Sequence, residues 1–116
     1  MSIKRFHTGP RMSQAVVHGE TVYLAGQVAQ NAPGEPVADQ TRDILAAIDR
    51  LLEEAGSDKS RLLSATIWLA DMHTFADMNE VWDAWVAPGE TPARACVEAQ
   101  LASPQYTVEI MVTAAR

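Results

Sequence analysis

One long amphipathic segment, residues 38–55, most constrains what this chain can fold into. Its apolar side chains recur at three- and four-residue spacing, which predicts a helix with one buried face, and Gly56 is a natural stop. Segments rich in β-formers stand before it, at 13–17 and 21–24, and after it, at 62–70. A helix between strands is a crossover connection, so part of the sheet can pair in parallel. The apolar stripe consists of Ile44, Leu45, Ile48, Leu51 and Leu52.

The second half of the chain continues the alternation of strand and helix. A second helix is predicted over 74–85, with Thr74 and Asp77 resembling a capping arrangement at its start. Two further strands follow, at 93–98 and 107–113. The order β-β-α-β-α-β-β predicts an α+β fold, a single mixed β-sheet with two helices packed on one face. We expect residues 1–116 to form a single domain.

Period-two alternation divides the side chains of the last two strands between the two faces of the sheet. The apolar sets of 93–98 and 107–113 are expected to face the helices. Arg94, Cys96 and Glu109 would then point together toward the other face, which is partly apolar. Such a face suggests a subunit interface with pockets in it.

Arg94 is the residue of this region that most suggests a ligand. A guanidinium in an apolar strand is costly to bury unless it is paired or kept for an anion, and its planar fork suits a carboxylate. Glu109 could equally be its structural partner. Cys96 alone indicates a small buried side chain, and without an accompanying histidine we propose no thiolate nucleophile.

Charge and composition argue against several function classes. Nine lysines and arginines stand against fifteen acids, a net charge of −6, which disfavours nucleic acid and anionic membranes as partners. No stretch could span a bilayer, the start lacks the apolar run of a signal peptide, and the single cysteine allows no internal disulfide. These features predict a cytoplasmic protein. The three histidines, His7, His18 and His73, show no metal-ligand spacing, so no metal site is predicted.

Several strings of residues resemble the RidA (YjgF) family of enamine/imine deaminases. The resemblance runs from about residue 12 to the C-terminus, and the order of elements also matches. The segment 92–98 is fairly specific to the family, whereas the Gly-Gln pair alone would be weak. The matching strings are Ala25-Gly26-Gln27-Val28, Glu54-Ala55-Gly56-Ser57, Asp71-Met72 with Phe75 and Met78-Asn79, Pro92-Ala93-Arg94-Ala95-Cys96-Val97-Glu98, and Val108-Glu109-Ile110.

This resemblance implies a chorismate-mutase-like protomer and a homotrimer with clefts between subunits. Family members hydrolyse reactive enamine or imine intermediates, such as 2-aminoacrylate, to 2-keto acids and ammonia without a metal or organic cofactor. By resemblance, Arg94 binds the substrate carboxylate and Glu109 positions the attacking water. Cys96, Asn79 and Gly26 fall at positions that line the pocket.

One departure from the family pattern concerns the cleft itself. Many members place a tyrosine before the first strand, and the corresponding position here is Met12. A hydroxyl is lost and an adaptable apolar side chain gained, which bears on substrate preference. Two alternatives to the deaminase stay open: a regulatory trimer that binds small carboxylates without turnover, and an RNA-cleaving protein, which the acidic charge disfavours.

Overall fold

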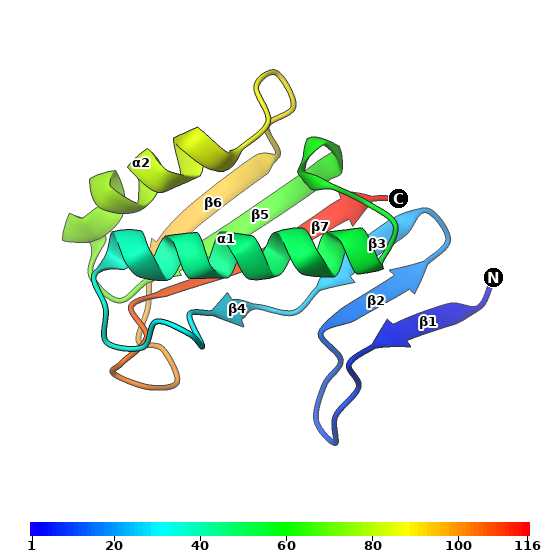
Figure 1. The fold of residues 1–116 in the computed structure, drawn as a ribbon, viewed down its shortest axis with the longest axis horizontal. Helices are drawn as coiled ribbons and strands as arrows, with labels where there is room; N and C mark the ends of the chain where they lie inside the picture. Colours follow the sequence, from blue (N-terminus) through cyan, green and yellow to red (C-terminus); the bar gives the residue numbers. More distant parts are fainter.

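The computed structural model describes all 116 residues, as one sheet with two helices (Figure 1). The helices are α1, Val37–Glu54, and α2, Phe75–Trp85, and the short 3₁₀ turns η1, Lys59–Arg61, and η2, Met72–Thr74, precede β5 and α2. The strands are β1 Ile3–Phe6, β2 Ala15–His18, β3 Thr21–Leu24, β4 Gln27–Val28, β5 Leu62–Leu69, β6 Ala93–Glu98 and β7 Val108–Ala115.

The strands are ordered β1-β2-β3-β7-β5-β6, with the short β4 pairing with β7. Only β5 and β6 run parallel, and α2 makes the crossover between them. The C-terminal strand β7 therefore lies in the middle of the sheet, antiparallel to β3, β4 and β5. The predicted α+β class and mixed sheet are confirmed.

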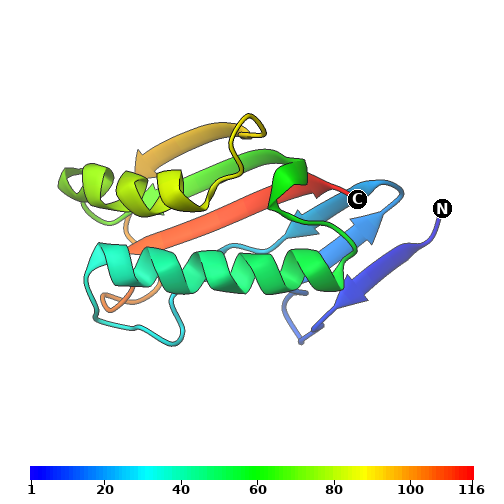
Figure 2. The same ribbon diagram turned by 45° about the horizontal axis from the view of Figure 1, so that its top comes forward.

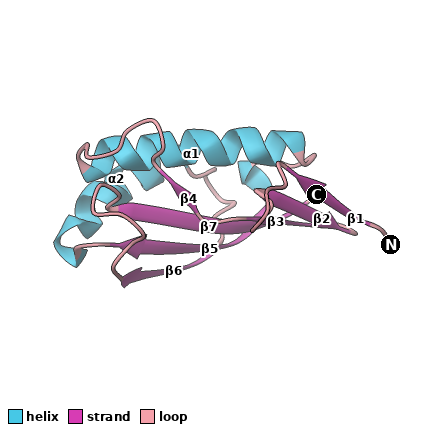
Figure 3. Ribbon diagram, turned by 90° about the horizontal axis from the view of Figure 1, so that it is seen from below, coloured by secondary structure: helices cyan, strands magenta, loops and turns pink.

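Both helices lie on the same face of the sheet, as the edge-on view of Figure 3 shows. The predicted stripe of α1 is buried in full and meets the alternate residues Val108, Ile110 and Val112 of β7, each at most 1% exposed. Burying side chains of this size contributes about 2 kcal/mol each. Neither helix is long and apolar enough to cross a membrane.

The opposite face of the sheet is bare: both helices lie in front of the sheet in Figure 2, and in the edge-on view of Figure 3 no helix lies on the far side of the strands. Several large apolar side chains stand on it, among them Tyr23 at 50%, Val97 at 47% and Met111 at 39% exposure. The cross-strand register places Tyr23 beside Thr113, on the side of β7 that faces away from the core. The expected second, partly apolar face is present, and the chain leaves it uncovered.

Three local features differ from the sequence-based expectations. Ile3–Phe6 forms the edge strand β1 and Gln27–Val28 forms the two-residue strand β4, at positions where the sequence predicted no strand. The predicted capping by Thr74 and Asp77 is wrong, because the Thr74 hydroxyl donates to the Asp71 carbonyl instead. Asp71 caps the preceding 3₁₀ turn by accepting from the backbone N–H of His73, which lowers the pKa of its carboxyl.

A buried amide joins α1 to the loop that precedes β7. The Gln40 side chain is 0% exposed, and its Nε2 donates to the carbonyls of Glu35 and Gln105, each at 2.9 Å. Its Oε1 accepts from the backbone N–H of Thr107 at 2.9 Å. The Gln105 carbonyl also accepts from the backbone N–H of Gly34, whereas the Thr107 N–H donates to Gln40 alone, so Gln40 helps to fix where β7 enters the sheet.

Replacement of Gln40 should therefore destabilise the fold. We expect Gln40→Ala to lower the free energy of unfolding by about 3 kcal/mol, because it removes the three hydrogen bonds of a fully buried amide and leaves a cavity in its place. Urea unfolding followed by circular dichroism measures the change. Gln105→Ala is the matched control, because only its backbone takes part, and it should cost under about 0.5 kcal/mol. Equal losses in the two variants would contradict this role for the Gln40 amide.

Candidate functional site

Arg94 lies on β6, the last strand at one edge of the sheet (Figure 1). The parallel register places Arg94 beside Ala65 and Cys96 beside Ile67 of β5, and both β5 residues are buried beneath the helices. The expectation that Arg94 and Cys96 point away from the helices is therefore wrong. At this edge the helix layer ends in the side chains of α2, which leave room for a charged group beside the core.

Three side chains of α2 surround the Arg94 guanidinium. Its Nη1 donates to Oδ1 of Asn79 at 2.8 Å. Its central carbon lies 5.3 Å from the ring centroid of Trp82 and 5.8 Å from that of Phe75. No carboxylate lies within ion-pair distance, so the positive charge is held by a neutral amide and two rings. Arg94 thus keeps its full charge and has donors left for an anion.

Cys96 is on the same side of β6 as Arg94 and packs against the core. Burial raises the pKa of its thiol, and the positive charge of Arg94 offsets this only in part. The side chain is accordingly a neutral thiol near pH 7, which agrees with a lining role and not with a nucleophile.

Glu109 lies on β7, on the bare face of the sheet. It is flanked in the cross-strand register by Trp68 of β5 and Val28 of β4. Its carboxylate rests on Gly26, where a Cβ would come within 2.2 Å of the Glu109 Oε2 atom. The sequence-based interpretation of Gly26 as a place of close approach is supported, and the approaching group is the Glu109 carboxylate.

Five of the predicted residues therefore fall into two groups that do not meet within the chain. Arg94, Asn79 and Cys96 lie on the helix side of β6, whereas Glu109 and Gly26 lie on the opposite face. Strand β5 also separates β6 from β7. The expectation that Arg94, Cys96 and Glu109 point together toward one face of the sheet is therefore wrong.

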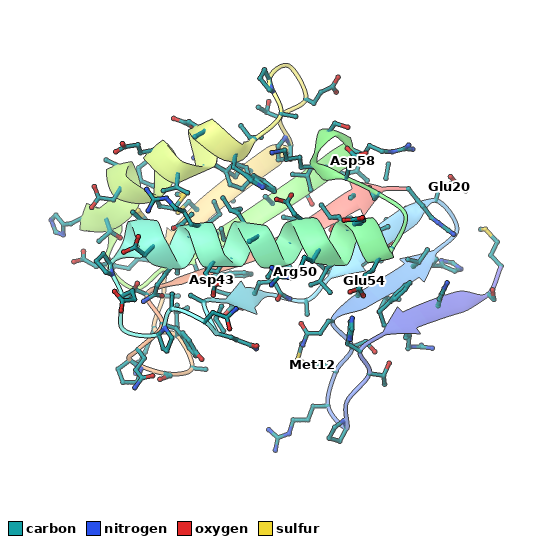
Figure 4. All side chains as sticks on the ribbon, viewed as in Figure 1. Met12, Glu20, Asp43, Arg50, Glu54 and Asp58 are labelled. Carbon is teal, nitrogen blue, oxygen red and sulfur yellow. The ribbon has the colours of Figure 1, made fainter.

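Met12 lies apart from both groups, in the loop between β1 and β2 (Figure 4). This loop is on the side of the molecule away from α2 and β6, and Met12 is 48% exposed. The loop is fastened to α1, because His7, whose φ is +53°, brings its Nε2 to 2.6 Å from Oε2 of Glu54. Met12 is thus presented outward on an anchored loop.

The hollows of the protomer surface contain neither Arg94 nor Glu109. A groove of about 450 Å³ lies between α1 and α2, lined by residues such as Leu45, Asp49 and Trp85. The other hollows lie beside α1 and at the two ends of the sheet. Neither the Arg94 group nor the Glu109 group is thus enclosed in a pocket of the single chain.

Sequence reasoning missed Trp82 and Phe75 as members of the Arg94 group. At 4% exposure Trp82 is a core side chain, but its ring also meets the guanidinium. A signal was available: Phe75, Asn79 and Trp82 stand at positions i, i+4 and i+7, on one face of α2.

Comparison with known proteins decides the family of the chain. Residues 2–116 match the family described as Endoribonuclease L-PSP. The RutC family protein YoaB of Escherichia coli is 46% identical over 115 residues, covering 99% of each chain. A RutC family protein of Haemophilus influenzae is 42% identical over 114 residues, covering 98% of each chain. The chain belongs to the YjgF/RidA family.

Solved structures of YjgF/RidA proteins share the fold described above. A YjgF family member from Neisseria meningitidis is 55% identical, with a TM-score of 0.97 over 100% of this chain and 96% of that one. The resemblance drawn from the sequence strings is confirmed at the level of the family and the α+β fold. The contact of Gly26 with Glu109 gives a physical reason for a glycine at this position of the chain, because any side chain would displace the carboxylate.

This contact generates a structural prediction. Gly26→Ala should displace the Glu109 carboxylate, because the added Cβ would overlap its Oε2 atom. The end of a glutamate is flexible, so we expect a stability loss of only about 1 kcal/mol together with a new Glu109 rotamer. A crystal structure of the variant and urea unfolding measure the two effects. Gly9→Ala is the control, since its Cβ would meet nothing closer than 3.6 Å. An unmoved Glu109 in Gly26→Ala would contradict this account.

Proposed function

We propose that this chain is a cofactor-independent hydrolase that converts small imines or enamines bearing a carboxylate into 2-keto acids and ammonia. The observation that carries the proposal is the state of Arg94. Its guanidinium is held in place by Asn79 and two rings, yet no carboxylate of the chain neutralises it. Such a group is suited to receive the carboxylate of a small acid in a forked, charge-assisted contact.

The second element of the proposal is a homotrimer with its sites in the clefts between copies. The separation of Arg94 from Glu109 supports it, because each group lacks the chemistry that the other supplies. The bare, partly apolar face of the sheet also supports it, since burying Tyr23, Val97 and Met111 would stabilise an assembly. In this arrangement Arg94 and Asn79 of one copy face Glu109 of the next.

The proposed reaction needs only binding and water delivery. The substrate carboxylate pairs with Arg94, which places the imine carbon near Glu109 of the neighbouring copy. Glu109 accepts a proton from a water as the water oxygen adds to that carbon, giving a tetrahedral carbinolamine. Glu109 passes this proton to the nitrogen, which completes the neutral carbinolamine. Glu109 then carries the hydroxyl proton to the nitrogen, the C–N bond breaks, and ammonia leaves as the keto carbonyl forms. One imine and one water thus give one keto acid and one ammonia.

Two other proposals for the same chain make different predictions. A regulatory trimer would bind carboxylates at Arg94 and release neither ammonia nor keto acid. An RNA-cleaving enzyme, as the family's description as an endoribonuclease suggests, would show salt-dependent RNA binding, which a net charge of −6 disfavours. Assaying ammonia and keto acid from imines generated in situ, beside RNA binding at several salt concentrations, separates the three.

Removal of Arg94 tests the proposed carboxylate contact. Arg94→Ala should lower kcat/KM on imino acids about 100-fold, because a charge-assisted forked contact is lost. Arg94→Lys should recover only part of this, since an ammonium lacks the fork. Arg42→Ala, on the outer surface of α1, is the control and should leave the rate unchanged. A folded Arg94→Ala protein with the wild-type rate would refute the contact.

A further inference from the structure

The side chains on one face of α2 contact the Arg94 side chain. Phe75, Asn79 and Trp82 all contact its guanidinium, and they are spaced by four and three residues along the helix. Asn79 takes Nη1, so the hydrogen-bond donors at Nε and Nη2 remain without a partner in the chain. The contacts from α2 thus hold the guanidinium on one side and leave its other donors available to a ligand.

The two rings differ in how firmly they are held. Trp82 is 4% exposed and belongs to the hydrophobic core, whereas Phe75 is 37% exposed. A buried indole cannot change rotamer without disturbing the core, so its face is a fixed surface for the guanidinium. The ring quadrupole attracts a cation, and tryptophan does so more strongly than phenylalanine.

Holding a cation by rings differs from holding it by a carboxylate. A carboxylate would orient the guanidinium but would also neutralise it and occupy the fork. A ring face orients the same group while its charge and remaining hydrogen bonds stay available to a ligand. Because the side chain would otherwise sample many rotamers, a fixed guanidinium binds an anion at a lower entropic cost.

We infer that Trp82 is a positioning residue for Arg94, with Phe75 as its weaker counterpart. Trp82 does not touch the substrate carboxylate; its indole face holds the guanidinium in the orientation that receives it. This inference rests on the proposed function for its ligand class, but it concerns carboxylate binding and can be tested without turnover.

The test compares Trp82→Leu with Trp82→Phe and uses pyruvate as the probe. The dissociation constant is measured by NMR titration, and the ¹H–¹⁵N resonance of the Arg94 Nε–H group reports the ring-current shift of the guanidinium. We expect Trp82→Leu to raise the dissociation constant about tenfold and to move the Arg94 resonance toward the free-arginine position. Trp82→Phe should restore most of both properties, because it keeps a ring at this position.

Trp85→Leu is the matched control for the loss of a large side chain. Trp85 lies 5.4 Å from Trp82, centroid to centroid, and its Nε1 donates to Asp49 at 3.0 Å, but it makes no ring contact with Arg94. This variant should lose stability while its pyruvate affinity changes less than about twofold. An equal loss of affinity in the two leucine variants would overturn the inference, because it would show a general effect of loosening the core.

Two further results keep the inference separate from the proposed function. If Trp82→Leu does not fold, the exposed Phe75→Leu serves in its place, and a shifted Arg94 resonance with about threefold weaker pyruvate binding supports ring positioning. Unchanged binding and an unchanged resonance in a folded variant would overturn it. Pyruvate binding that depends on Trp82 in a protein that hydrolyses no imine would refute the deaminase and leave the positioning role standing.

Discussion

The register between β5 and β6 fixes the geometry on which the rest of the site depends. Pairing Arg94 with Ala65 commits the guanidinium to the helix side of the sheet, and alternation along β7 commits Glu109 to the bare side. A slip of one residue would exchange the faces of every side chain on β6. Because the helices cover only one face, a cation beneath α2 and a carboxylate on the open sheet cannot act together within one chain.

The environment of Arg94 shows how a charge can be stabilised without being cancelled. An amide oxygen and two aromatic faces compensate the guanidinium, and a partner carboxylate is absent from its surroundings. On the other face, the missing side chain of Gly26 makes room for the Glu109 carboxylate. In the proposed reaction, Arg94 would bind the carboxylate of a small acid and Glu109 would accept a proton from water, and imine hydrolysis requires both functions.

Local sequence patterns predicted the helices, most strands and their buried faces. They did not predict which strands pair with each other over long distances in the sequence. The stripe of α1, the buried face of β7 and the close approach at Gly26 each follow from a few adjacent residues. The face of Arg94 could not be predicted that way, because it depends on β6 being an edge strand beside the rings of α2. The prediction that Arg94 and Glu109 lie together was wrong because β5 pairs between their two strands, and the order of strands in the sequence does not reveal this.

Complementation between two inactive variants tests the central claim, that the site is shared between copies. Arg94→Ala lacks the carboxylate receptor and Glu109→Gln lacks the proton acceptor, so each homo-oligomer should be inactive. Refolded together from urea, the two should form mixed oligomers in which about a quarter of the clefts pair an intact Arg94 with an intact Glu109 of the neighbour. The account predicts recovery of about that fraction of the wild-type rate of keto-acid release. Mixed oligomers, demonstrated by mass spectrometry, that stay as inactive as their parents would contradict it.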